Sequence, residues 1–125
     1  MLRKKINTDE VEEIWNGDEE KKNLNTEYFG VGDLEVSNND KYLGYSLDIK
    51  GSEYYTIFIR NIENNKITTK EISETSGGIT FSLDDKFIFY SKKIKVGLYL
   101  LKQSLEKNST HLLRLYQFQL FWSKL

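Results

Sequence analysis

The sequence predicts an all-β protein made of about two four-stranded antiparallel β-propeller blades, which form an incomplete propeller. Three observations predict this fold. The stretch Gly32–Lys50 recurs 45 residues later as Gly77–Lys95, with eight of nineteen positions identical. A repeat of roughly 40–45 residues with four strands per unit has the size of a propeller blade. The chain also contains eight tyrosines and seven phenylalanines, and aromatic residues favour strands.

Each copy of the repeat predicts a β-hairpin. An apolar run enters, a polar Ser-x-x-Asp-Lys turn reverses the chain, and a second apolar run leaves. The identical positions pair Gly32 with Gly77, Ser37 with Ser82, Asp40 with Asp85, Lys41 with Lys86, Tyr45 with Tyr90, Ser46 with Ser91, Ile49 with Ile94 and Lys50 with Lys95.

Composition limits the classes of function. A length of 125 residues predicts one domain or a piece of one. The formal net charge of −1 gives no electrostatic reason to bind nucleic acid or an anionic membrane. Cysteine is absent, which excludes disulfides, thiolate metal sites and cysteine nucleophiles. No apolar run follows the basic start Met1–Lys5, and no window approaches the roughly 18 apolar residues of a membrane span. We therefore expect a soluble, cytoplasmic protein.

Residues 1–26 are expected to be a lead-in with a short strand and a charged loop. Met1–Glu13 is polar and has no clear period. Val11–Trp15 alternates as a short strand would, and Asn16-Gly17 ends it. The mixed charges of Asp18–Asn25 indicate a solvated loop or one turn of helix.

Residues 27–76 are expected to form the first blade. Glu27–Gly32 contains two glycines, but it lacks the Lys-Ser/Thr of a phosphate loop, so we expect a backbone bend at a strand start. Four strands are predicted, at Asp33–Val36, Tyr42–Asp48, Glu53–Asn61 and Lys66–Ile72.

Residues 77–117 are expected to form the second blade. Compared with the first copy, the second copy is two residues shorter between Lys95 and Leu98. The two copies therefore align at an offset of 45 residues before this point and of 43 residues after it. The predicted strands are Ile79–Phe81, Phe87–Lys92, Leu98–Leu105 and His111–Tyr116. Local propensity also allows a helix over Leu98–Lys107. Residues 118–125, which include Gln119–Trp122, would begin a truncated third blade.

Four segments carry a resemblance to a known family. Glu27–Gly32 is similar to its aromatic-rich blade start, Leu34–Ser46 to its "EVSPDNxxLAYSxD" hairpin, Ile59–Asn64 to "xRNLETG" and Ile72–Phe81 to "IENxSxxxxW". In this order they resemble the N-terminal propeller blades of the oligopeptidase B (protease II) group of the prolyl oligopeptidase family of serine peptidases. Phe87–Ser91 and Leu98–Glu106 continue the pattern more weakly.

The sequence departs from the family pattern in two places. Asn38 stands where the family usually has proline, and Leu101–Glu106 only partly follows the family's "YRHxLGT" strand.

The resemblance implies a role without chemistry of its own. The whole enzymes, serine-type endopeptidases and hence hydrolases, place a Ser-Asp-His triad on a separate α/β-hydrolase domain, and their propeller restricts access to short peptides. No Gly-x-Ser-x-Gly motif occurs in this sequence, and Ser76-Gly77-Gly78 lacks the strand-to-helix setting of a nucleophile. The lone histidine, His111, is interpreted as a polar residue at a strand start. We therefore expect no catalytic, cofactor-binding or metal-binding residue in this chain.

Other polar groups have simple structural interpretations. Asp84-Asp85, and Asp40 with Glu35, lack the alternating ligands of a calcium loop, so solvated turn carboxylates are expected. Asn108-Ser109-Thr110 fits a glycosylation acceptor without a secretory context. The basic cluster at Lys92, Lys93 and Lys95 fits an exposed strand end.

Three hypotheses follow. The first is a non-catalytic propeller fragment of an oligopeptidase-B-like serine endopeptidase, whose partner would be a separate chain that carries the remaining blades and the hydrolase domain. Two blades leave an open edge and uncovered sheet faces, so such a partner is expected. The alternative is a free-standing small β-module that binds peptide or protein by an exposed strand edge. The third is an unrelated adaptor with a helical carboxy-terminal third. One continuous sheet through the Val36 and Phe81 hairpins would contradict the propeller.

Overall fold

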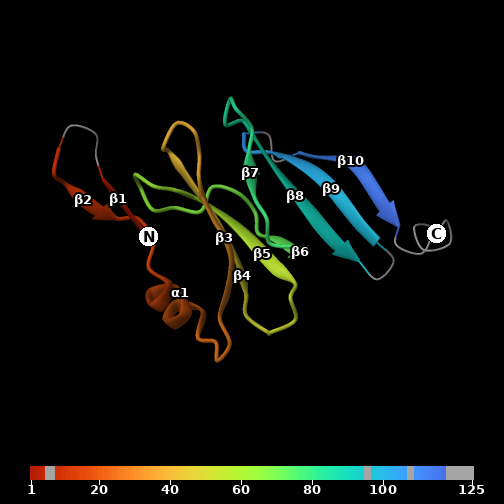
Figure 1. The fold of residues 1–125 in the computed structure, drawn as a ribbon, viewed down its shortest axis with the longest axis horizontal. Coiled ribbons are helices and arrows are strands. Elements are labelled where there is room, and N and C mark those ends of the chain that lie inside the picture. Colours follow the sequence, from red (N-terminus) through yellow and green to blue (C-terminus); the bar gives the residue numbers. More distant parts are fainter. Residues whose placement is uncertain (5–7, 95–96, 107–108, 118–125) are drawn as a thin grey trace.

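The structure is a computed structural model that describes residues 1–4, 8–94, 97–106 and 109–117. It consists mostly of antiparallel strands with one short helix (Figure 1). The path of paired strands in the main sheet ends at β3 on one side and at β10 on the other, so the described strands do not close a ring. The prediction of an all-β, incomplete propeller is confirmed.

The first four-stranded unit, which we call blade 1, contains β3 (Gly30–Val36), β4 (Tyr42–Asp48), β5 (Tyr55–Asn61) and β6 (Ile72–Thr75). Its strands pair antiparallel in chain order. Gly44 of β4 lies opposite Ile59 of β5. The second predicted strand has the observed bounds, and the first and third differ by a few residues at one end.

The second unit, blade 2, contains β7 (Thr80–Phe81), β8 (Phe87–Ile94), β9 (Gly97–Ser104) and β10 (Thr110–Gln117). Phe89 lies opposite Lys102, as Gly44 lies opposite Ile59 in blade 1. These pairs reproduce the offsets of 45 and 43 residues that the sequence predicted. Because β9 is a strand, the alternative of a helix over residues 98–107 is wrong.

The predicted fourth strand of blade 1, Lys66–Ile72, is wrong in position. Ile67 makes only an isolated bridge to Arg60, and the strand β6 begins at Ile72. Burial explains the shift, since Ile72 is 7% exposed and Thr75 is fully buried, whereas most side chains between Lys66 and Glu71 are exposed. The strand therefore forms over the residues whose side chains are buried, Ile72 and Thr75.

The N-terminal segment is more ordered than expected. β1 (Leu2–Lys4) pairs with β2 (Val11–Glu13). The short strand predicted at Val11–Trp15 is therefore present over Val11–Glu13, whereas a lead-in without regular structure is wrong for residues 2–4. The helix α1 (Gly17–Leu24) replaces the expected charged loop or single turn.

The N-cap and the order of charges explain helix α1. The side chain of Asn16 accepts hydrogen bonds from the backbone N–H groups of Asp18 and Glu19, at 3.0 and 3.3 Å. The acidic residues lie in the first turn and the basic residues Lys21 and Lys22 in the last turn, which is the order that the helix dipole favours. No residue of the helix is buried, so the expectation of a solvated segment is confirmed.

Two apolar clusters stabilise the fold. The first, which we call the cap cluster, lies on the outer face of blade 1, where Ile14, Trp15 and Phe29 of the N-terminal segment pack on residues of β3, β4 and β5. The second lies between the blades and contains Ile57, Ile59, Ile72, Ile79, Ile88 and Tyr90. Blade 1 is therefore covered on one face by the N-terminal segment and on the other by blade 2.

The blades meet by their faces. Hydrogen bonding joins them where β6 leads into blade 2, at the pair of Thr75 with Lys92 and at the bond from Ser76 N to Ser91 O, 2.9 Å. Beyond this crossing the contact is made by side chains of the apolar cluster between them. Strand pairing therefore runs through both hairpins as one eight-stranded sheet, the arrangement that would contradict the propeller. However, β6 and β8 are paired at a single position, Thr75 with Lys92, and the apolar cluster packs the two units face to face. The Val36 and Phe81 hairpins thus belong to two stacked units. The predicted domain limits at residues 26, 76 and 117 stay predictions.

Candidate functional site

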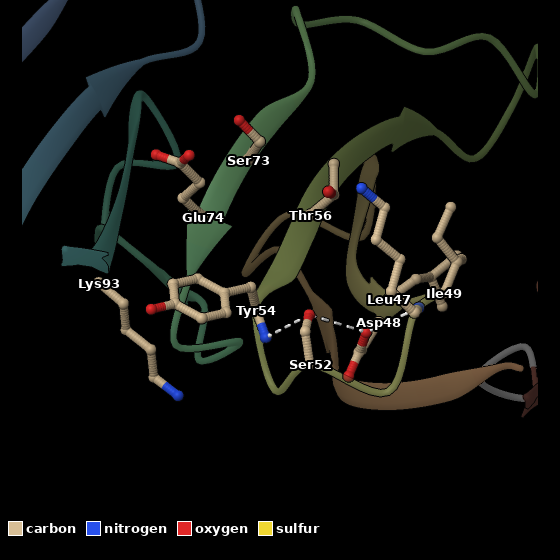
Figure 2. Close-up of a pocket in the computed structure, with 10 residues that line it drawn as sticks. Leu47, Asp48, Ile49, Ser52, Tyr54, Thr56, Ser73, Glu74 and Lys93 are labelled. Carbon is tan, nitrogen blue, oxygen red and sulfur yellow. Dashed lines mark hydrogen bonds between the residues drawn. The ribbon is translucent and has the colours of Figure 1, made fainter. Parts of the chain in front are cut away.

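A groove of about 700 Å³ lies at the seam between the two blades, beyond the ends of β4 and β5 (Figure 2). Blade 1 contributes most of its lining and blade 2 contributes Lys93. The lining residues are Leu47, Asp48, Ile49, Lys50, Ser52, Tyr54, Thr56, Ser73, Glu74 and Lys93.

Asp48 organises the floor of the groove. Its side chain is 2% exposed, and its carboxylate accepts hydrogen bonds from the backbone N–H groups of Lys50 and Gly51, at 3.0 Å each, and of Glu53, at 2.8 Å. Burial acts to raise the pKa of Asp48, but these N–H donors together outweigh it and lower the pKa. Asp48 therefore holds the loop in shape as a carboxylate and does not act as a general acid.

The walls of the groove offer an amine, a hydroxyl and a carboxylate. Lys93 donates from Nζ to the carbonyl oxygen of Glu53 at 2.9 Å and lies 5.8 Å from the centroid of the Tyr54 ring. Ser73 and Glu74 are exposed on β6. Glu74 has a φ of 59°. It lies at the irregularity where the three residue steps from Ile72 to Thr75 on β6 oppose two steps on β5. The groove can hold polar groups, but none of its lining residues is a histidine that could activate Ser73.

The residues considered for catalysis lie apart from the groove. His111 is exposed on β10 opposite Lys102. Ser76 follows β6 directly and Gly77 has a φ of 99°, in a turn that no helix follows. Histidine, serine and an orienting acid are not brought together within the described residues. The absence of a catalytic residue from the whole chain stays a prediction.

The two turn carboxylates of the second copy, Asp84 and Asp85, differ in their exposure. Asp84 accepts from the hydroxyl of Ser82 at 2.7 Å, which is the largest cause of its lowered pKa, and it is exposed as expected. Asp85 is 7% exposed, so the expectation of a solvated carboxylate is wrong there. The described residues contain no group of three or more acidic or histidine side chains that could hold a metal ion.

Asp85 is buried because it binds the turn of blade 1. Its Oδ1 accepts from the backbone N and the Nδ2 of Asn38, at 2.9 and 3.0 Å, and its Oδ2 accepts from the backbone N of Asn39 at 2.7 Å. Asn38 Nδ2 also donates to the carbonyl oxygen of Ser82 at 3.0 Å. We call this contact between the two hairpin turns the turn clamp. The repeat showed where both turns lie, but nothing in the sequence showed that they touch.

A second polar contact fastens the helix to blade 1. Arg60 donates to the phenol oxygen of Tyr45 at 2.7 Å and pairs with Glu20 of α1. Its guanidinium lies 5.0 Å from the centroid of the Tyr45 ring. Burial raises the pKa of Tyr45 to about 12, although Arg60 acts in the opposite direction. This contact has a structural role and offers no group for chemistry.

Comparison with known proteins agrees with this fold. The family model described as the N-terminal β-propeller domain of prolyl oligopeptidase matches residues 8–113. The chain belongs to this family. Its whole members are serine peptidases, and this chain covers only the propeller region.

Two curated relatives match about half of this propeller segment. Dipeptidyl aminopeptidase BI of Pseudoxanthomonas mexicana is 30% identical over 67 residues, which make up 54% of this chain and 9% of that protein. An uncharacterized peptidase of Sinorhizobium fredii is 24% identical over 66 residues, 53% of this chain and 9% of that protein. The chain therefore spans only a small part of the relatives that it matches.

Solved structures share the fold over most of the chain. Oligopeptidase B from Leishmania major superposes with a TM-score of 0.74 and 18% identity, over 92% of this chain and 16% of that one. A structure from a study of two prolyl endopeptidases gives a TM-score of 0.67 with 12% identity, over 85% of this chain and 15% of that one. These structures agree with the predicted fold, and the family model over residues 8–113 confirms the predicted family.

Some predictions lie outside the described residues. These include the third blade expected at residues 118–125 and the acceptor Asn108 of the glycosylation motif. No helix in the described part of the chain has both the length and the apolar character that a membrane crossing requires.

Proposed function

We propose that this chain supplies a non-catalytic part of the propeller of an oligopeptidase-B-like serine endopeptidase. In the whole enzyme the propeller would cover the active site and admit only short peptides. The observation that carries the proposal is the face-to-face stack of two blades within residues 8–113, the range that the propeller family model matches. The groove of Figure 2 supports a role in contact, because it holds polar side chains without a nucleophile and base in reach of each other.

The proposal implies a partner for the exposed part of the stack. The remaining blades and the α/β-hydrolase domain would be supplied by a separate chain or by further sequence of the same protein. We place the assembled peptidase in the cytoplasm. Peptides are then ligands of the whole enzyme, and neither nucleic acid nor membrane is a partner.

The proposal is tested in two steps. A reading frame downstream of the coding sequence should encode further blades and a Gly-x-Ser-x-Gly motif. The purified chain should not hydrolyse arginyl or lysyl peptide substrates alone, and hydrolysis should appear when the polypeptide that carries this motif is added. Hydrolysis by the isolated chain, or flanking DNA without any hydrolase sequence, would contradict the proposal.

The alternative is a free-standing β-module that binds a peptide along an exposed strand edge. The observation in its favour is β10, which ends the path of paired strands and exposes Leu112 and Leu113 at 58% and 47%. Saturable binding of an extended peptide that shifts the amide resonances of Leu112 and Leu113, with no hydrolysis after the polypeptide that carries the Gly-x-Ser-x-Gly motif is added, would favour this alternative over the peptidase fragment.

A further inference from the structure

The two blades present different faces to whatever follows them. In blade 1 the face toward blade 2 carries small and aliphatic residues, and its members Gly44, Ser46, Ile57 and Ile59 are all buried. The repeat offsets place four counterparts on the far face of blade 2, and none of them is fully buried. These are Phe89, Ser91, Leu100 and Lys102. We call these four residues the open face.

The turn clamp shows the same asymmetry. In blade 1 the backbone N–H groups of Asn38 and Asn39 bind the Asp85 carboxylate. Their counterparts in blade 2 are Leu83 and Asp84. Leu83 is 94% exposed, and no described residue accepts a hydrogen bond from its N–H. The Asp84 N–H has no described acceptor outside its own turn.

The geometry points to one occupant for the open face, and this inference rests on the proposed function. We propose that a further propeller blade docks there and presents an aspartate at the fourth position of a Ser-x-x-Asp-Lys turn. That carboxylate would accept from the N–H groups of Leu83 and Asp84, as Asp85 accepts from blade 1. Charge-assisted bonds to paired N–H groups are the strong class of hydrogen bond.

The open face also limits which side chains the docking blade can carry. A Cβ built on Gly44 would lie 3.2 Å from Ile79 of blade 2, so the isoleucine fits because Gly44 has no side chain. Phe89 occupies the Gly44 position in blade 2. The docking blade must therefore carry a small residue where blade 2 carries Ile79.

Lys102 adds a charge requirement. Its counterpart in blade 1 is the fully buried Ile59, and its Nζ lies 3.8 Å from the centroid of the Phe87 ring. An ammonium group covered by a blade needs an acidic neighbour, since burial without a partner is costly. We therefore expect an aspartate or glutamate on the docking blade opposite Lys102.

A second copy of this chain is a poor occupant. The outer face of its blade 1 is already covered by Trp15 and its neighbours. The turn that carries the exposed Asp40 is tied to the N-terminal hairpin, because Arg3 donates from its guanidinium to the Asp40 carbonyl oxygen at 3.1 Å. Within the described residues, the outer face of blade 1 is therefore not available to pack on the open face of another copy.

The test uses the whole ¹⁵N-labelled chain and synthetic hairpins that are cyclised to hold the turn. The first hairpin has the sequence of residues 79–91 with alanine in place of Ile79. The second also has asparagine in place of Asp85, and the third keeps Ile79 and Asp85. We expect the first to shift the amide resonances of Leu83 and Asp84 saturably, and the other two to bind at least tenfold more weakly.

A chain variant provides the matched control. Leu83→Pro removes one of the two donors of the clamp at a position where the family turn usually holds proline, so it should weaken the preference for aspartate over asparagine in the hairpin. Equal shifts with the first two hairpins, shifts confined to the N-terminal segment, or no shift at millimolar hairpin would overturn the proposal. Shifts of Leu83 that grow with chain concentration alone would assign the face to a second copy. Because no hydrolase is present, this outcome is independent of whether the proposed peptidase exists.

Discussion

Blade 1 and blade 2 are built from the same hairpin, but the described residues cover both faces of blade 1 and only one face of blade 2. The identical serine and aspartate turns give both hairpins one geometry: Ser37 and Ser82 donate to Asn39 and Asp84 at 2.8 and 2.7 Å. Outside the turns, the two copies differ in sequence at the positions that another blade covers in blade 1 but not in blade 2. Repeat units of this kind stabilise one another mainly through their neighbours, so differences between copies report the position of each unit in the stack.

Two equivalent cross-strand pairs illustrate this difference: Gly44 with Ile59 in blade 1, and Phe89 with Lys102 in blade 2. The same place in the fold holds a glycine and an aliphatic residue where a blade lies over it, and a phenylalanine and a lysine where no described residue covers it. An ammonium group on the open face keeps that face soluble and shields the Phe87 ring. The divergence of the copies is therefore physical information about their surroundings.

Removing the cap should have the largest effect. Trp15 is 7% exposed; it stacks on Phe29 with ring centroids 6.4 Å apart and packs against the tilted ring of Tyr45 at 5.8 Å. Its Nε1 makes no hydrogen bond to a described residue, so its contribution is packing. Trp15→Ala should lower the free energy of unfolding by about 3–5 kcal/mol in urea titrations. The matched Phe89→Ala on the open face should cost about 1 kcal/mol. Equal losses would mean that both faces are covered alike.

Truncation at the matched positions 59 and 102 should give the next largest difference. Ile59 is fully buried between the blades, so Ile59→Ala should cost about 2–5 kcal/mol. Lys102→Ala removes only the contact with the Phe87 ring and should cost about 0.5–1 kcal/mol. Chemical denaturation of the two variants measures both values. A Lys102→Ala loss as large as that of Ile59→Ala would show that the open face is part of the core.

Most of the fold could be predicted from the sequence because the repeat fixes it. The tandem copies gave the hairpins, the register and the two offsets, and so overruled the local helix propensity of residues 98–107. Where no repeat was available, prediction failed. β6 begins at Ile72 because the sheet buries Ile72 and Thr75, and local propensity does not reveal which residues a neighbouring blade covers.

The N-terminal segment and the turn clamp show the same limit. The charges of Asp18–Asn25 predict a solvated segment, but they do not by themselves distinguish a loop from a helix. Asn16 followed by acidic and then basic residues is the helix signal. The clamp joins Asn38 and Asp85, which lie 47 residues apart. A spacing in the sequence does not show which of two aspartates at the same turn position will be buried.

The turn clamp offers the third comparison. Asp85 and Asp40 have φ values of 56° and 60°, which asparagine also adopts readily. Asp85→Asn keeps the backbone but removes the charge from the bonds to Asn38 and Asn39, and should cost about 1.5–3 kcal/mol in equilibrium unfolding. Asp40→Asn should change stability by less than about 0.5 kcal/mol, because Asp40 is exposed. A larger loss at Asp40 than at Asp85 would be inconsistent with a clamp between the described blades.

The smallest expected difference between the blades is in how stability depends on acid pH. Backbone N–H donors, acting against burial, lower the pKa of Asp48 from its ordinary 3.8, whereas the counterpart in blade 2 is Lys93. A group whose folded pKa is lowered contributes stability above its unfolded pKa and loses it as the pH falls. The urea midpoint should therefore stay constant from pH 7 to about 5 and decline below about pH 4. Asp48→Asn should have a lower midpoint at neutral pH and a weaker acid dependence. Part of that dependence should remain, because the pKa of Asp84 is lowered too. An Asp48→Asn variant as acid-sensitive as the parent would show that this loop carries none of the effect.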